Sequence, residues 1–132
     1  MAKRVAKRRS SVGKKRSGRP SKRGARRSGG HTQKAGKDAV TLVVQLRPRE
    51  GQDLLLEAEL RALLGPTRKE NGCLVYDLYR AVEPPNAFML HEVWASRDDH
   101  TRHTKTDHFL RWNARKDGLL ANLERLFWKQ IG

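Results

Sequence analysis

Two alternating runs separated by a proline-rich turn constrain the fold of this chain more than any other feature. The first run spans Leu74 to Arg80 and the second spans Ala87 to Trp94, with Pro84, Pro85 and Asn86 between them. Alternating apolar residues bounded by proline and asparagine are typical of β-strands joined by a turn. We therefore expect the two runs to pair as antiparallel strands.

The chain changes from strand to helix directly after Trp94. Ser96 can cap a helix, and Asp98 and Asp99 are favourable in the first turn, where the helix dipole is positive. We expect helical segments at about 97–105 and 109–119.

The remaining periodic segments supply two outer strands and one more helix. An alternating run begins the folded region, a leucine stripe with helical spacing follows, and Gly65-Pro66 should end or kink that helix. The expected elements are a strand at 40–46, a helix at about 52–64, and a last strand at about 123–131. The order β-α-β-β-α-β predicts an α+β, ferredoxin-like antiparallel sheet with helices on one face.

Three of the four strands carry apolar residues on both faces. In the first run, which is the second strand, Leu74, Tyr76 and Leu78 share a face. The third strand carries Phe88, Leu90, Glu92 and Trp94 on one face and Met89, His91 and Val93 on the other. Helices can cover only one face of a sheet, and a second copy is the simplest cover for the other. The pattern predicts a homodimer.

A set of residues at fixed spacing resembles one known family. The set consists of Gly72, Cys73, Tyr76, Asp77, Leu78, Glu92, Trp94, His103, His108 and Phe109. It resembles the antibiotic biosynthesis monooxygenase (ABM) domain, and the resemblance covers about residues 40 to 131. The resemblance implies a dimeric α/β barrel and a cofactor-free monooxygenase that uses molecular oxygen on an aromatic quinol or polyphenol.

A subset of the resembled family degrades haem, and one departure argues against that activity here. Haem degraders of this fold use an Asn of the first strand together with a Trp and a His. Trp94 and His103 match two of the three, but residues 40–46 contain no Asn, and Gln45 is the nearest substitute.

Glu92, Trp94 and His103 are the candidate catalytic residues. Glu92 and Trp94 point to the same side of their strand, and Glu92 needs a partner in an otherwise apolar layer. We expect that partner to be His103, with Glu92 fixing its tautomer, His103 acting as general base and Trp94 stacking on a flat substrate. The alternative is a structural Glu–His pair with Trp94 in the core.

The candidate substrate-binding residues are Tyr76, Arg80, His108 and Phe109. The rival hypothesis is a non-enzymatic module in which the domain only dimerises and carries the N-terminal segment. A cavity between Trp94 and His103 would favour the enzyme, whereas a filled space would favour the scaffold.

We expect no metal and no bound cofactor. His100 and His103 share a helix face near Asp99 and His108, but this is not a recognised zinc spacing. There is no glycine-rich loop for a flavin or nicotinamide nucleotide. Cys73 has no basic neighbour in sequence, so we interpret it as a small buried hydrophobe rather than a nucleophile.

The charge of the chain is concentrated at its N-terminus. Residues 1–38 hold 15 Lys and Arg with one acid, whereas residues 39–132 hold 14 Lys and Arg with 13 acids. A segment so basic and so poor in apolar residues should be disordered. We therefore expect a disordered polybasic tail at 1–38 and one ABM-like domain at 39–132.

The tail is a candidate nucleic-acid-binding arm, for DNA or RNA, because dense positive charge binds phosphates with little sequence preference. Residues 14–20 also resemble an AT-hook, although Ser17 replaces its first core arginine. The alternative is a tail that aids solubility or meets another anionic surface. The expected contact residues are Lys14, Lys15, Arg16, Arg19, Lys22, Arg23, Arg26 and Arg27.

The cysteine count and the hydropathy of the chain indicate which cellular compartment the protein occupies. One cysteine excludes an internal disulfide framework and fits a reducing compartment, and no apolar run is long enough for a membrane span. A transit peptide is the alternative role for the basic N-terminus, but periodic large apolar residues are missing. We expect a cytoplasmic protein, with nucleoid association if the tail binds DNA.

Overall fold

A computed structural model describes residues 36–132, so the predictions made for residues 1–35 lie outside the described residues. The described part contains four strands and three helices. They are β1 (Val40–Pro48), α1 (Asp53–Arg68), β2 (Cys73–Arg80), β3 (Phe88–Trp94), α2 (Arg97–His103), α3 (Asp107–Leu119) and β4 (Leu120–Trp128).

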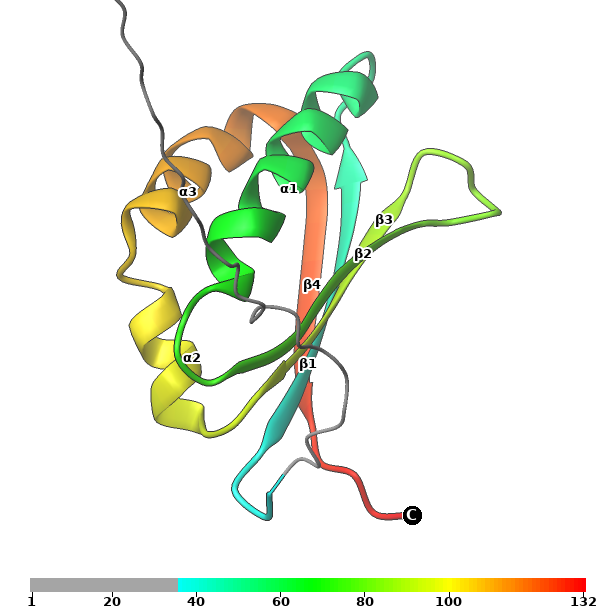
Figure 1. The fold of residues 1–132 in the computed structure, drawn as a ribbon. Helices are drawn as coiled ribbons and strands as arrows, with labels where there is room; N and C mark the ends of the chain where they lie inside the picture. The colour runs from blue at the N-terminus through cyan, green and yellow to red at the C-terminus, as the bar shows by residue number, and fades with distance from the viewer. Residues whose placement is uncertain (1–35) are drawn as a thin grey trace, which may run out of the picture. The chain divides into compact units, whose positions relative to one another are not determined.

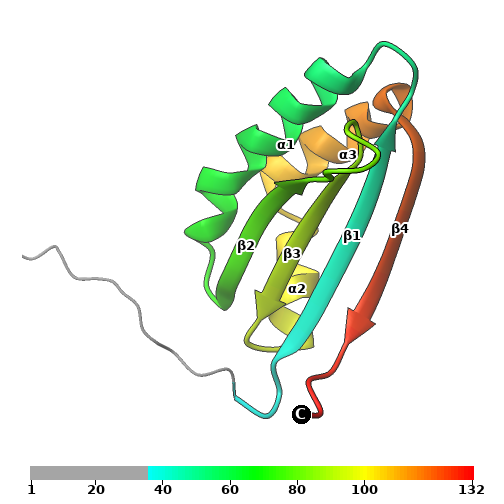
Figure 2. The same cartoon turned by 90° about the vertical axis from the view of Figure 1, so that its right-hand side faces the viewer.

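The four strands form one antiparallel sheet in the order β2-β3-β1-β4. All three helices lie on the same side of this sheet (Figure 1). Viewed from the opposite side, the strands lie uncovered in front of the helices (Figure 2). The α+β, ferredoxin-like fold predicted from the sequence is confirmed.

The central strand β3 follows the predicted alternation. Phe88, Leu90, Glu92 and Trp94 are buried, while the three residues between them are half-buried. His91 therefore lies on the face opposite Glu92, as predicted. Ser96 caps α2 and accepts a hydrogen bond from the Asp99 N–H at 3.1 Å, also as predicted.

A β-bulge changes which residues of β2 face the helices. The register against β3 shifts between Cys73 and Val75, so that Cys73 pairs with Trp94 and Tyr76 with Glu92. Cys73 packs against the core on the face we had assigned to Leu74. The prediction that Leu74 shares a face with Tyr76 is wrong because one extra residue interrupts the alternation.

Helix α1 runs through the Gly65-Pro66 pair that we expected to end it. Leu63 and Thr67, on either side of the pair, are both buried, with 3% and 0% of their surface exposed. The missing Pro66 N–H removes one hydrogen bond near the end of the helix, and the Lys69 N–H still donates to Pro66 O at 3.3 Å. Tertiary packing therefore holds the last turn in place.

Strand β4 lies earlier in the chain than predicted. It spans Leu120–Trp128, and its last pairing joins Trp128 to Thr41, one residue after the start of β1. Ile131 extends beyond the sheet and is 95% exposed, contrary to the expectation that it belongs to the strand. The partner strand thus sets the end of β4.

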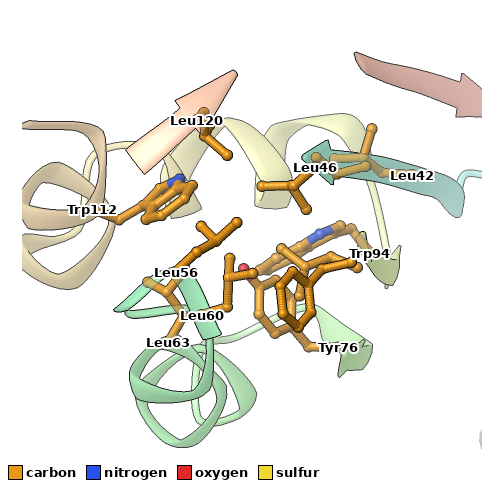
Figure 3. Close-up of a cluster of buried hydrophobic side chains, with 12 residues drawn as sticks. Leu42, Leu46, Leu56, Leu60, Leu63, Tyr76, Trp94, Trp112 and Leu120 are labelled. Atoms are coloured by element: carbon orange, nitrogen blue, oxygen red, sulfur yellow. The ribbon is translucent and has the colours of Figure 1, made fainter. Parts of the chain in front are cut away.

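The core lies between the sheet and the helices. Figure 3 shows Tyr76 beside Trp94, with Trp112 near Leu120 across the cluster. The opposite face of the sheet is left open, and Leu126 and Trp128 of β4 are 60% and 52% exposed there. Among residues 36–132, no helix is both long enough and apolar enough to span a bilayer.

Candidate active site

A cavity of about 670 Å³ lies between the helix-facing side of the sheet and helices α2 and α3. Leu42, Val44 and Leu46 of β1 contribute a row of apolar side chains to its wall. Ionisable groups also line it, among them Tyr76, Glu92, His100, His103 and Arg125. The volume is in the range of small-molecule pockets, and the mixture of apolar surface with a few polar groups is typical of them.

The start of α2 is fixed against the turn that precedes β2. Gly72 has a φ of 85°, and a Cβ there would lie 2.2 Å from Asp99 Cγ. The Ala95 N–H donates to Gly72 O at 2.8 Å, and Ser96 Oγ donates to Asp99 Oδ2 at 2.9 Å. Only glycine fits this conformation and this approach, so the contact brings residues 69–72 close to α2.

Glu70, in that turn, holds two histidines. Its Oε2 lies 2.8 Å from His103 Nδ1 and 2.5 Å from His108 Nε2. A carboxylate oxygen can only accept, so each of these nitrogens carries the hydrogen. The predicted Glu92–His103 pair is therefore wrong: the carboxylate that orients His103 comes from the α1–β2 turn, and sequence adjacency of β3 and α2 misled the prediction.

His103 is buried, and its ring lines the cavity. Burial lowers the pKa of His103, and the hydrogen bond to Glu70 opposes this effect. With the hydrogen on Nδ1 held by Glu70, the neutral ring has Nε2 free as a proton acceptor. The arrangement is that of an imidazole oriented by a carboxylate.

Glu92 and Trp94 form a separate buried pair. Trp94 Nε1 donates to Glu92 Oε1 at 2.9 Å. Burial raises the pKa of Glu92 to about 7, while the hydrogen bond from Trp94 and the charge of Arg125 oppose the rise. Glu92 lines the cavity and can gain or lose a proton near neutral pH.

Trp94 does not occupy the position we predicted for a stacking wall. It is fully buried, it is not among the residues lining the cavity, and its ring centroid lies 4.9 Å from that of His103. The side chain thus supports His103 from within the core. The prediction that Trp94 shares a strand face with Glu92 is confirmed, but the rings of Tyr76, His100 and His103 surround the indole.

His100 adds a second buried imidazole to the cavity wall. Burial, followed by the proximity of His103 and Arg125, lowers the pKa of His100 to about 4. Its ring meets Phe127 edge-on with centroids 5.3 Å apart. His100 is therefore neutral at physiological pH and contributes a polar but uncharged surface.

Of the four predicted substrate-binding residues, two line the cavity and two do not. Tyr76 and Phe109 line the cavity. Burial, then the nearby Glu92, raises the pKa of Tyr76 well above its usual value, so its hydroxyl stays protonated. Arg80 lies instead at the exposed end of β2, paired with Glu57, and His108 contacts Glu70 without lining the cavity.

Sequence reasoning missed three further residues of the site. Trp112 lines the cavity from α3, three residues after Phe109, a helical spacing that could have identified it. Arg125 lines it from β4, on the same face as Leu123 and Phe127, and strand alternation could have identified it. Glu70 lies in a turn, where no periodic signal marks its direction.

Glu70, His103 and His108 are the residues best able to hold a metal. Within residues 36–132 they form a group whose potential ligand atoms all lie within 4.8 Å of one another. Ligands around zinc at about 2.0–2.2 Å would be separated by roughly 3.3 Å, more than the 2.8 Å and 2.5 Å contacts here. These distances are those of hydrogen bonds.

Cys73 has the properties of a buried hydrophobe rather than a nucleophile. Burial, followed by the nearby charge of Glu70, raises the pKa of Cys73 to about 12. The thiolate is the reactive form of cysteine, and it is scarcely populated at such a value. This supports the role predicted for Cys73.

Comparison with known proteins identifies the family. A relative named putative monooxygenase Rv0793, from Mycobacterium tuberculosis, is 33% identical over 82 residues, covering 62% of this chain and 80% of the relative. The solved structure of Rv0793 matches with a TM-score of 0.68 at 28% identity, covering 71% of this chain and 96% of that one. PA3566 from Pseudomonas aeruginosa matches with a TM-score of 0.70 at 32% identity, covering 76% of this chain and 100% of that one. The profile of the antibiotic biosynthesis monooxygenase family matches residues 39–115, and the chain belongs to this family.

Proposed function

We propose that this protein is a cofactor-independent monooxygenase that oxidises a quinol or polyphenol with molecular oxygen. The observation that carries the proposal is the cavity of about 670 Å³ into which an imidazole oriented by Glu70 is built. A base, an apolar slot and shelter from water are the parts that such a reaction needs from the protein.

The proposed reaction starts with proton transfer from a substrate hydroxyl to Nε2 of His103. The resulting anion is electron-rich and donates electrons to oxygen without a separate reductant. A new C–O bond forms at a ring carbon, the O–O bond breaks, and the second oxygen leaves as water with two protons. A dihydroxyaromatic thereby becomes a hydroxyquinone, with all four electrons supplied by the substrate.

Glu70 and Glu92 take different parts in this mechanism. Glu70 fixes the His103 tautomer and stabilises the imidazolium formed by the first proton transfer, because its carboxylate bonds Nδ1 at 2.8 Å. Glu92, with a pKa raised to about 7, donates a proton to the oxygen atoms that come from molecular oxygen, or accepts one from them. Tyr76, Phe109 and Trp112 contribute aromatic surface for a flat ring.

The functional unit in this proposal is a homodimer. Val43 of β1 pairs with Leu126 of β4 on the uncovered face of the sheet, and Trp128 adds further apolar surface. A sheet face of this kind is covered by another layer in stable proteins. A second copy covering it leaves the cavity on the helix side untouched.

A second candidate function rests on charge. Residues 1–38 carry a net charge of +14, whereas residues 39–132 carry +1. We propose that the basic segment binds nucleic acid through phosphates, and that the folded domain then carries two such segments per dimer. If the protein has no oxidation activity, its function is that of a non-enzymatic scaffold, a dimeric domain that carries the basic segments.

Oxygen uptake with a panel of naphthalene and benzene quinols tests the proposed reaction. We expect uptake that is unaffected by a chelator, and incorporation of one ¹⁸O atom from ¹⁸O₂ into the product. His103→Ala should lower the rate by roughly a hundredfold or more, the usual scale for loss of a general base. Thr101→Ala, on the exposed side of the same helix, is the matched control and should retain full activity.

Two results would contradict the proposal. Turnover of a substrate by His103→Ala at the wild-type rate would exclude His103 as the base. Failure of the wild-type protein across the whole panel, with the fold intact by circular dichroism, would favour the scaffold role.

A further inference from the structure

The cavity has groups of opposite charge on the two sides of its apolar row. Glu92 of β3 pairs with Leu42 of β1, and Arg125 of β4 pairs with Val44, two residues further along. The apolar row of β1 therefore runs between the carboxyl group and the guanidinium group. Strand spacing places their Cα atoms about 12 Å apart.

Within the described part of the chain, Arg125 differs from the other cationic residue of the cavity wall in having no carboxylate partner. Arg125 and Lys116 are the cationic residues among those described that line the cavity, and Lys116 lies 3.3 Å from the Asp117 carboxylate. Of the ion pairs within residues 36–132, none includes Arg125. The guanidinium is thus free to bind an anion that enters the cavity.

The charge of Arg125 already acts on the ionisable groups of the cavity. It lowers the pKa of both Glu92 and His100. For Glu92 this opposes the larger effect of burial, which raises the pKa, whereas for His100 burial also lowers the pKa. An anion bound to Arg125 would therefore lie within electrostatic reach of the groups proposed to move protons. A flat molecule between them would have one end beside Glu92 and His103 and the other beside Arg125.

We propose that Arg125 is a specificity residue that binds an acidic substituent, a carboxylate or sulfonate, of the aromatic substrate. A planar guanidinium binds such groups through two parallel hydrogen bonds. The reacting ring then lies over Leu42 and Val44, toward His103. This inference rests on the proposed function in one respect only, that the same cavity binds the substrate.

Two fluorescent probes test this directly, because they differ by one acidic group. They are 8-anilinonaphthalene-1-sulfonate and the neutral N-phenyl-1-naphthylamine. Each is titrated into the full chain at about 150 mM salt, which limits non-specific attraction to the basic segment. The matched control is Arg47→Gln, which removes the same charge from the same sheet at an exposed position of β1 outside the cavity.

We expect the sulfonate probe to bind more tightly than the neutral probe, and Arg125→Gln to raise its Kd about tenfold while leaving the neutral probe unchanged. Arg47→Gln should leave both values unchanged. An equal effect of both substitutions, an equal effect on both probes, or no binding of either probe would overturn the inference. Because no turnover is measured, a failed oxidation assay with Arg125-dependent binding would overturn the proposed reaction alone.

Discussion

The carboxylate of Glu70 and Nδ1 of His103 are 2.8 Å apart although the residues are 33 positions apart in the chain. The contact joins the α1–β2 turn to the end of α2, and the same Oε2 reaches His108 in the first turn of α3. One oxygen thus fixes three segments around the buried end of the cavity. The orientation of the proposed base depends on Glu70 and on the Gly72 contact that positions the turn.

Replacing Glu70 by Gln should impair the reaction without preventing folding. Gln has nearly the same shape but cannot stabilise a charged imidazolium, so we expect kcat to fall roughly tenfold to a hundredfold with little change in KM. Because the hydrogen bond and charge of Glu70 raise the pKa of His103 against burial, the acid limb of the pH–rate profile should also move to lower pH.

The control for this substitution is Glu57→Gln. Glu57 pairs with Arg61 and Arg80 on the exposed side of α1 and does not line the cavity. An unchanged pH profile in Glu70→Gln, or an equal loss of activity in Glu57→Gln, would show that Glu70 acts only on general stability. Nitrogen chemical shifts of His103 offer an independent check of its Nδ1–H tautomer.

Stability should depend on pH through Glu92 in a direction opposite to that of most carboxylates. Its pKa is raised from 4.5 to about 7 in the folded state, so the folded protein binds more protons than the unfolded chain between these values. The free energy of unfolding should therefore fall as pH rises from about 4.5 to above 7. At about 1.4 kcal/mol per pKa unit, the loss amounts to roughly 3 kcal/mol.

Glu92→Gln isolates this effect because Gln cannot ionise. Urea unfolding at pH 5 and pH 8 should show the variant gaining stability relative to the wild type at the higher pH. His100, whose pKa is lowered to about 4, acts in the opposite direction by destabilising the fold as pH falls below about 6.5, and it is common to both proteins. A pH-independent difference would show that Glu92 is ionised throughout.

The order of the elements was predictable from local pattern because each element buries its own periodic apolar stripe. The bounds that failed depended on partners distant in sequence. Packing of Leu63 and Thr67 keeps α1 helical through Pro66, and pairing with the start of β1 sets the end of β4. A bulge in β2, opposite Trp94, places Cys73 on the core face, where alternation had predicted Leu74.

The site was predictable where alternation or helix spacing fixes the direction of a side chain. Glu92, Tyr76 and His103 all line the cavity on this basis. The partner of His103 was not predictable, since Glu70 lies in a turn and reaches the histidine only through the tertiary contact of Gly72 with Asp99. Trp94 shows a further limit: the face of a strand does not distinguish a cavity wall from the packing behind it.

A charge on the uncovered face of the sheet should dissociate the proposed homodimer. Sedimentation of the wild-type chain should give about twice its mass of 15.1 kDa. Leu126→Glu places a carboxylate on this face beside Val43, and burying it without a partner would cost several kcal/mol, so monomer should predominate at micromolar concentration.

Leu110→Glu is the control for that experiment. Leu110 lies on α3, on the helix side of the sheet, and its exposed fraction of 51% is similar to the 60% of Leu126. It should leave the dimer intact. A folded wild-type monomer at micromolar concentration, or equal dissociation by both variants, would contradict the proposed interface.

The last prediction concerns the basic N-terminal segment. Residues 1–38 carry +14, and a polycation beside DNA or RNA releases the counterions condensed on the phosphates. If six to ten of its basic residues contact phosphate, the affinity of the full chain should fall on the order of a thousandfold or more between about 50 and 200 mM salt. Two segments in one dimer should bind more tightly than the isolated peptide, because the second contact is intramolecular.

A salt titration of the full chain against a chain that starts at Ala39 measures this effect. The shorter chain has a net charge of +1 and should bind weakly, with a shallow dependence on salt. Equal weak binding by both chains at low salt would exclude the nucleic-acid role. A preference for A·T-rich duplex that is lost in Arg19→Ala would show that the segment also reads the narrow minor groove, as the Gly18-Arg19-Pro20 sequence suggests.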